Sequence, residues 1–262
     1  MTKDILSVAL VALALGLAPA MPAAADDQAP ATGHASVAGH AHWAYEGTEG
    51  PEHWGELDPG FGPCAAGVDQ TPIDIEETVE AELPPLAIDY RTLGQEVVNN
   101  GHTIQVNVAP GSTLMINGVP FELKQFHFHT PSENEVGAKH FAMEGHLVHA
   151  DQAGHLAVIG VLYQLGDADP TIAQVWAASP PEAGTSQAPV TPVDPKTLLP
   201  QARDYYAFSG SLTTPPCTEG VRWMLMKEPL TVSPEQVAYL EHAVHGHNNR
   251  PVQPVNARLI LR

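Results

Sequence analysis

The density of proline and glycine limits the length of every regular element that this chain can form. The 262 residues include 25 prolines and 22 glycines. Proline lacks a backbone donor and clashes inside a helix, and both residues favour turns. The chain must therefore turn often, which argues against a long-helix bundle or a coiled coil. A hydrophobic content of 44% with only 16% charged residues is typical of a globular protein.

Several segments between these turns alternate apolar and polar residues as strands do. Thr103–Ala109, for example, places three branched apolar side chains on one face. Leu156–Leu165 is almost wholly apolar, so we expect both of its faces to be covered. The predicted strands are Thr103–Ala109, Phe121–Thr130, Glu144–Ala150, Leu156–Gln164, Tyr206–Leu212 and Val221–Lys227.

Helix signals are few. Asp169 and Ser233 each precede a proline, which is the pattern of an N-cap followed by proline in the first turn. They predict helices over residues 171–178 and 236–245, with Gly246 as a C-terminal stop. The stretch from Pro180 to Pro195 is interpreted as a loop. The sequence from Trp43 onward has neither a low-complexity linker nor a repeat, so it predicts one β-dominated domain with short peripheral helices.

The first 25 residues have the pattern of a secretory signal peptide. Lys3 precedes the apolar run Ile5–Ala18, whose 14 residues are too few for a spanning helix. Ala23 and Ala25 form an A-x-A site, so we expect cleavage after Ala25 and a periplasmic or secreted protein. An uncleaved membrane anchor is the alternative.

Residues 26–42 are interpreted as a flexible leader. It contains His34, His40 and His42, which are either incidental or a loose metal-binding tract. The chain has two cysteines, Cys64 and Cys217, and an oxidising compartment makes one disulfide the default expectation. Two buried free thiols are the alternative.

The charge balance restricts the partners. Eleven basic and 30 acidic residues give a formal net charge of −19. A phosphate backbone or an anionic membrane surface would repel such a chain. The sequence therefore predicts no nucleic-acid partner and no membrane insertion after signal cleavage.

Two of the predicted strands contain histidines in a metal-binding pattern. His127 and His129 are two residues apart, so they point to the same face of a strand. Glu144 and His146 share a face of another strand, and antiparallel pairing would bring His146 opposite the first two. Three neutral imidazoles without a thiolate suit Zn2+ and leave its fourth position open, as in catalytic zinc sites.

A further segment, Leu212–Pro216, ends a strand with two threonines and a Pro-Pro pair. A Pro-Pro turn fixes the backbone direction, and one of its peptide bonds is a candidate for the cis form. A rigid threonine hydroxyl there can orient a metal-bound hydroxide. By itself the segment would be interpreted as an ordinary turn with incidental threonines.

Seven blocks together resemble one family. They are Gly50–Trp54, Gln70–Ile75, Asn99–His102, Gln125–His129, Glu144–His149, Leu212–Pro216 and Asn249–Pro251. From about Trp43 to Arg262 the chain resembles the α-class carbonic anhydrases of the secreted bacterial type. The resemblance implies a single domain, residues 43–262, with a large twisted, mostly antiparallel central sheet. It also implies the Cys64–Cys217 bridge, and it leaves a homodimer open because such relatives often dimerise.

The activity that the resemblance implies is the reversible hydration of carbon dioxide to bicarbonate and a proton. His127, His129 and His146 would bind zinc, and zinc-bound hydroxide would attack carbon dioxide. Thr213 would accept a hydrogen bond from that hydroxide and donate its own proton to Glu133. His102 would carry the released proton outward.

The resemblance assigns supporting roles as well. Each ligand imidazole needs its other nitrogen held, which Gln125, Glu144 and the carbonyl of Asn248 would do for His127, His146 and His129. Tyr45 and Asn100 would order the water molecules of the proton path. The substrate would lie beside Thr214 and an apolar wall made of Val148, Leu156, Val158, Leu212, Val221 and Trp223.

The chain departs from the family pattern at three positions: Asn134, where many members have histidine, Asn249 and Gly220. We expect Asn134 to alter the support around Glu133. Two other functions stay open: a non-enzymatic binding module on the same scaffold, and a periplasmic zinc buffer that uses the leader histidines.

Overall fold

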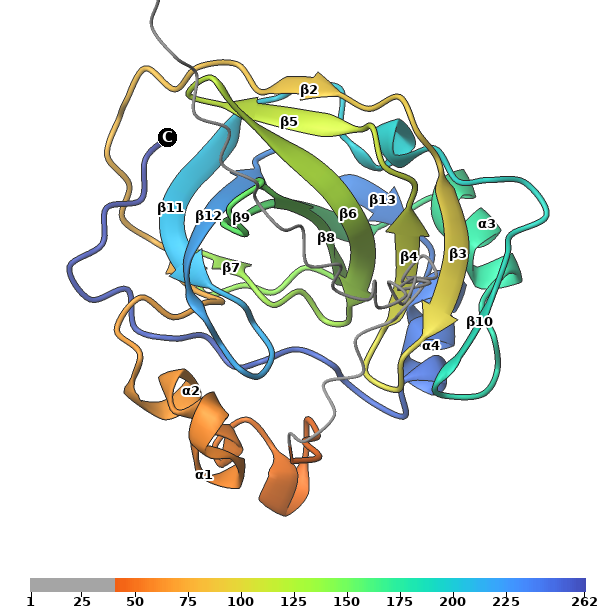
Figure 1. The fold of residues 1–262 in the computed structure, drawn as a ribbon, viewed down its shortest axis with the longest axis horizontal. Helices are drawn as coiled ribbons and strands as arrows, with labels where there is room; N and C mark the ends of the chain where they lie inside the picture. The colour runs from red at the N-terminus through yellow and green to blue at the C-terminus, as the bar shows by residue number, and fades with distance from the viewer. Residues whose placement is uncertain (1–40) are drawn as a thin grey trace, which may run out of the picture. The chain divides into compact units, whose positions relative to one another are not determined.

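The computed structural model describes residues 41–262. The predicted signal peptide (1–25) and nearly all of the predicted leader (26–42) lie outside the described residues. The main element is an 11-stranded sheet with the order β10-β3-β4-β6-β8-β9-β12-β11, to which β2, β5 and β13 attach. It twists and curls strongly (Figure 1). Its strands are β2 (Ala87–Asp89), β3 (Gly94–Asn99), β4 (Ile104–Val108), β5 (Thr113–Ile116), β6 (Val119–His129), β8 (Met143–Ala150), β9 (Leu156–Leu165), β10 (Thr185–Gln187), β11 (Tyr205–Ser211), β12 (Glu219–Met226) and β13 (Leu230–Val232).

The pairing is antiparallel except where β9 meets β12 and β13. The predicted fold class, a mainly β domain with a mostly antiparallel sheet, is therefore confirmed. All six predicted strands are present, with ends that differ by no more than two residues. A two-stranded parallel sheet, β1 (Asp74–Ile75) with β7 (Glu135–Val136), lies apart from the main sheet.

Strand β9 explains why the middle of the sheet is so apolar. Ile159 and Val161 face one hydrophobic core, while Val158 and Leu162 face the other. A strand whose alternate residues enter two different cores is covered on both faces. The expectation for Leu156–Leu165 is thus confirmed, except at its last two residues, which are exposed.

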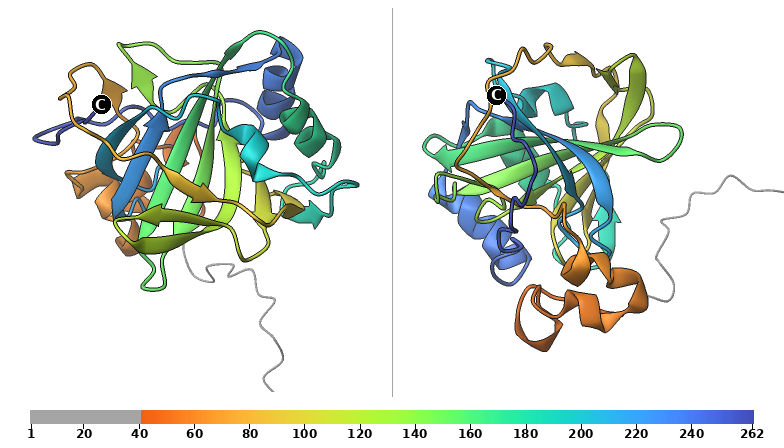
Figure 2. Two further views of the ribbon diagram at one scale, coloured as in Figure 1. Left: turned by 90° about the horizontal axis from the view of Figure 1, so that it is seen from above. Right: turned by 90° about the vertical axis from the view of Figure 1, so that its left-hand side faces the viewer.

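The two longer helices pack together on one side of the sheet (Figure 2). Asp169 caps α3 (Pro170–Ala177), and Ser233 forms a capping box with Gln236 in α4 (Pro234–Ala243), as their sequences predict. The predicted helix end at His245 is two residues too late, because α4 ends at Ala243. Gly246 still closes the helix, since its N–H donates to the Glu241 carbonyl at 2.9 Å. The backbone already turns left-handed at His245 (φ 63°), before Gly246. The remaining helices are one-turn segments: η1 (Gly47–Glu49), α1 (Trp54–Leu57), η2 (Pro59–Phe61), α2 (Pro63–Ala66) and η3 (Pro195–Leu198).

One predicted loop contains a strand. Residues 185–187, inside the Pro180–Pro195 stretch, form β10, the edge strand that pairs with β3. All three side chains of β10 are exposed. Backbone pairing and one side-chain hydrogen bond, from Ser186 to Glu96, hold this strand, so no apolar alternation marks it in the sequence.

Cys64 and Cys217 form a disulfide, with their Cα atoms 5.0 Å apart, so the expected bridge is confirmed. It joins α2 to the segment that follows Pro216, and the sulfurs pack with Trp54 and Phe61 in a small separate core. The peptide bond between Pro215 and Pro216 is cis. No helix within residues 41–262 is long and apolar enough to cross a membrane.

A buried histidine makes stability depend on pH. His149 is fully buried, with Nε2 2.7 Å from the Tyr90 hydroxyl and Nδ1 3.2 Å from the Ala157 carbonyl. Burial lowers the pKa of His149 to about 4, from 6.5. Between these values the unfolded chain binds the proton and the folded chain does not, so stability falls as the pH falls.

We expect wild type to lose about 2 kcal/mol more unfolding free energy than His149→Gln between pH 7 and pH 5. Urea unfolding of both proteins at the two pH values measures this difference. An equal loss in both would show that His149 does not titrate across this window.

Candidate metal centre

Two adjacent strands bring three histidines together. His127 and His129 lie on β6, and His146 lies on β8 directly opposite His127 in an antiparallel register. One nitrogen from each ring lies within 4.8 Å of the other two. Alternation along β6 places its two histidines on the same face. The convergence that the spacing predicts is therefore present.

Each ring uses its other nitrogen for a contact with the protein. His127 Nδ1 lies 2.8 Å from Gln125 Oε1, and His129 Nδ1 donates to the Asn248 carbonyl at 2.7 Å. His146 Nε2 lies 3.0 Å from Glu144 Oε1. Because all three partner atoms are acceptors, these nitrogens carry the protons. Nε2 of His127, Nε2 of His129 and Nδ1 of His146 keep their lone pairs.

Electrostatics favours the neutral form of all three rings. Burial lowers the pKa of His127 and of His146 well below the usual value, and the neighbouring imidazoles lower them further. Burial also lowers the pKa of His129, against the opposing effect of its bond to Asn248. Metal binding requires neutral imidazole, so burial prepares these residues as ligands.

Two unpaired atoms indicate that this site suits a cation. Among the buried side-chain atoms that the structure describes, His129 Nε2 and Glu133 Oε2 form no hydrogen bond, and they lie 3.5 Å apart. Both are acceptors when His129 donates through Nδ1 and Glu133 is ionised, so no proton joins them. A divalent cation among the three rings would satisfy the imidazole lone pair. Three nitrogen donors without thiolate suit zinc.

Glu133 is fully buried beside the three histidines. Its Oε1 accepts from the Arg250 backbone N–H at 2.9 Å. Burial raises the pKa of Glu133 to about 8, although the Arg250 N–H and the Thr213 side chain both act to lower it. A cation at the three rings would act in the opposite direction and favour the carboxylate.

The strand register divides the sheet face around the site into a polar half and an apolar half. Directly opposed residues point to the same side, so one row can be followed from strand to strand. Three polar side chains begin this row and four apolar side chains continue it. In order across β3, β4, β6, β8, β9, β12 and β11 they are Glu96, Asn107, Gln125, Val148, Val158, Trp223 and Phe208.

The apolar half is continuous with the histidines. The Trp223 ring lies edge-on to His146, with ring centres 4.9 Å apart. One hydrophobic cluster includes all six residues predicted for the apolar wall: Val148, Leu156, Val158, Leu212, Val221 and Trp223. Gly220 is the additional residue of a bulge between β11 and β12, where its φ of +87° disfavours a larger side chain.

His102 lies in a different environment from the three ligand candidates. Its ring stacks on Trp43, with ring centres 3.7 Å apart, and Tyr45 lies edge-on at 6.4 Å. Burial, and then the neighbouring His42, lower the pKa of His102 to about 4. Asn100 Oδ1 accepts from the backbone N–H groups of His102 and Thr103, so it shapes this turn.

Sequence reasoning missed the stacking of Trp43 on His102 and the hydrogen bonds of Asn134 and Arg250. Asn134 donates to Glu144, not to Glu133, so the expected change in support concerns a different carboxylate. The Arg250 guanidinium donates to Gln70 Oε1 and to two backbone carbonyls. The Arg250 contacts join positions 179 to 186 residues apart, which no local pattern reveals.

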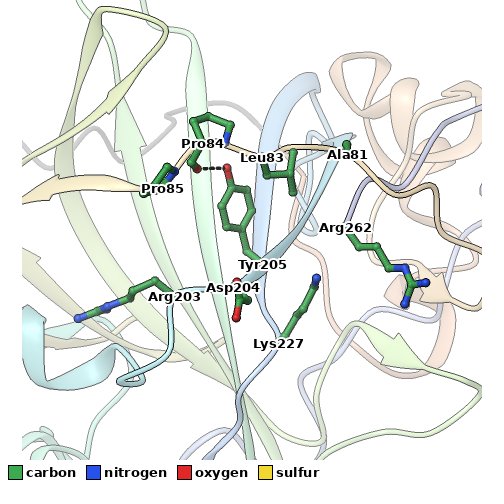
Figure 3. A pocket seen from close by; sticks show the side chains of 9 residues that line it. All are labelled: Ala81, Leu83, Pro84, Pro85, Arg203, Asp204, Tyr205, Lys227 and Arg262. Atoms are coloured by element: carbon green, nitrogen blue, oxygen red, sulfur yellow. Dashed lines mark hydrogen bonds between the residues drawn. The ribbon is translucent and has the colours of Figure 1, made fainter.

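A cavity of about 240 Å³ lies away from the three histidines, none of which lines it (Figure 3). Arg203, Lys227 and Arg262 contribute to its lining. Arg262 is paired with Glu80 at 3.3 Å, and Asp204 adds another negative charge. The mixed charges do not form an anion site.

The chain is similar to known proteins over most of its length. The family model of the eukaryotic-type carbonic anhydrases matches residues 49–262. A carbonic anhydrase of Pectobacterium carotovorum is 46% identical over 227 residues, which cover 87% of this chain and 93% of that protein. The α-carbonic anhydrase of Thermovibrio ammonificans, solved with the inhibitor sulfanilamide, is 46% identical with a TM-score of 0.84. The match covers 86% of this chain and all of that one.

The chain is also similar to a protein that is not named a carbonic anhydrase. Dioscorin dioA3 of Dioscorea japonica is 36% identical over 221 residues, which cover 81% of this chain and 82% of that protein. The extent of the family match and the bacterial identities decide the assignment. The chain belongs to the eukaryotic-type, or α-class, carbonic anhydrase family.

Proposed function

We propose that this protein is a zinc-dependent carbonic anhydrase that interconverts carbon dioxide and bicarbonate through His127, His129 and His146. The observation that carries the proposal is the convergence of three neutral imidazole nitrogens within 4.8 Å, one of them buried without a hydrogen bond. Zinc in such a site lowers the pKa of a bound water to about 7 at an open coordination position, and carbonic anhydrase is the standard example of this effect.

Thr213 and Glu133 would orient the reacting oxygen. The Glu133 carboxylate can only accept, so the Thr213 hydroxyl must donate to it. The threonine oxygen is then left as an acceptor toward the site. It would accept a hydrogen bond from the reacting oxygen and so direct a lone pair of that oxygen to the substrate.

The apolar half of the row would hold carbon dioxide. Carbon dioxide is nonpolar and forms few hydrogen bonds, so a wall of Val148, Val158 and Trp223 offers it a dry surface next to the metal. Thr214, which is half-buried, would line the same position and contact bicarbonate. Gln125, Glu144 and Asn248 would keep the three ligand rings in the required tautomer.

His102 would export the proton, with Tyr45 and Asn100 along the path. Because the ring stacked on Trp43 has a pKa of about 4, this role requires the ring to turn out into water when it takes up the proton. We expect His102→Ala to lower kcat about 10²-fold in weak buffer while kcat/KM changes little, because proton export follows hydration. Added imidazole should restore kcat. The measurement is stopped-flow hydration at low and high buffer concentration. A kcat that is unchanged in weak buffer would exclude His102 from the path.

The remaining expectations complete the proposal. Residues 1–25 act as a signal peptide that directs the domain of residues 43–262 to the periplasm or the medium, in agreement with a disulfide that oxidising compartments favour. The protein forms a monomer or a homodimer. Deletion of residues 26–42 tests the zinc-buffer alternative, because unchanged zinc content would exclude it.

A further inference from the structure

A buried amide stands behind the carboxylate that holds His146. Asn134 is fully buried, and its Nδ2 donates to Glu144 Oε1 at 2.7 Å. Its backbone N–H donates to Glu144 Oε2, also at 2.7 Å. Asn134 therefore donates hydrogen bonds to both oxygens of this carboxylate, one from its side chain and one from its backbone.

The orientation of this amide is fixed from its other end. Asn134 Oδ1 accepts from the Ile73 backbone N–H at 3.0 Å. A backbone N–H can only donate, so the amide oxygen must face Ile73 and the NH2 group must face Glu144. The side chain thus links the segment before β1 to the carboxylate on β8.

Four N–H groups surround the Glu144 carboxylate. Oε2 accepts from the backbones of Glu133 and Asn134, and Oε1 accepts from the Asn134 side chain and approaches His146 Nε2 at 3.0 Å. Without Asn134 Nδ2, the only hydrogen-bond partner of Oε1 among the described residues would be the imidazole that it has to hold. The side-chain amide is the one partner of Oε1 that does not move with His146.

We propose that Asn134 is a positioning residue that holds Glu144 Oε1 in place and, through it, keeps Nδ1 of His146 aimed at the metal position. The inference rests on the proposed function, since it assumes zinc at the three histidines. Removing the amide donor lets the carboxylate turn, and the His146 ring turns with it. Loss of such outer contacts typically weakens metal binding 10- to 100-fold.

The decisive variant is Asn134→Asp, which keeps the size and the acceptor for Ile73 but replaces the donor with an oxygen. The matched control is Asn99→Asp. Asn99 is also a buried amide that donates to a carbonyl, that of Pro180, and accepts from a backbone N–H, that of Gly101, but it does not contact Glu144. Asn134→His restores an N–H donor, and Asn134→Ala removes the donor without adding charge.

The readout is the rate at which the zinc-loaded protein releases zinc to excess dipicolinate. We expect Asn134→Asp and Asn134→Ala to release zinc at least about 10-fold faster than wild type. Asn99→Asp should stay within about twofold and Asn134→His within about threefold of the wild-type rate. A general structural role would instead accelerate release in proportion to lost thermal stability, in the control as well.

If Asn134→Asp destabilises the fold, Asn134→Ala at a temperature well below its melting point decides. Wild-type release rates in folded Asn134→Asp or Asn134→Ala would overturn the role of Asn134 and leave the zinc site standing. A wild-type protein that binds no zinc would instead overturn the proposed function, and this inference with it.

Discussion

Replacing His127 with alanine is expected to abolish carbon dioxide hydration and to leave a folded protein with little bound zinc. His127 supplies one of three converging nitrogens, and it is the one that stays partly accessible at the open side of the site. Loss of a ligand should weaken binding by more than the 10- to 100-fold cost of losing an outer contact. Metal analysis after dialysis and a stopped-flow hydration assay measure both effects.

The matched control is His155→Ala. His155 is an exposed histidine whose ring contacts Asp151, and it does not belong to the three-histidine cluster. This variant should keep one zinc per chain and wild-type activity. His127→Ala with wild-type activity would mean that the three-histidine cluster is not the catalytic centre.

The second large effect is expected at Thr213. Thr213→Ala should lower kcat/KM about 10²-fold without changing zinc content, because it removes a hydrogen bond to a charged group and leaves Glu133 without its hydroxyl partner. The stopped-flow hydration assay measures the loss of kcat/KM, and metal analysis after dialysis shows whether zinc content is unchanged.

Thr213→Ser is the informative companion, since it keeps the hydroxyl and should recover most of the activity. If Thr213→Ala keeps kcat/KM within about twofold of wild type, Thr213 does not orient the reacting oxygen.

Much of the site could be predicted from the sequence because strands have a two-residue period. The spacing of His127 and His129 requires a common face, and antiparallel pairing of β6 with β8 is all that is needed to bring in His146. The capped starts of α3 and α4 were equally readable, because Asp169 and Ser233 act on backbone groups of their own helices.

The features that escaped prediction depend on contacts between distant segments. Strand β10 has no buried side chain, so only its backbone pairing with β3 identifies it. The amide of Asn134 could not be assigned to Glu144 without the fold, since its orientation depends on Ile73, 61 positions away. The division of one sheet row into polar and apolar halves follows from the registers of seven strands.

The family assignment accounts for the fold. The row of opposed residues from Glu96 to Phe208 shows that one face of the sheet has a polar half and an apolar half beside the histidines. Gln125, at the end of the polar half, contacts His127, and under the proposed function the apolar side chains on β8, β9 and β12 would cover the substrate side. The Trp223 ring at 4.9 Å from His146 marks the boundary. A nonpolar molecule on the apolar side therefore lies directly beside the proposed metal.

The most direct test is metal analysis of the purified wild-type protein combined with a carbon dioxide hydration assay before chelation, after chelation and after zinc is restored. We predict about one zinc per chain, activity that disappears with the metal and activity that returns with zinc. A protein fully loaded with zinc at the three histidines but unable to hydrate carbon dioxide, or one equally active without zinc, would contradict the account.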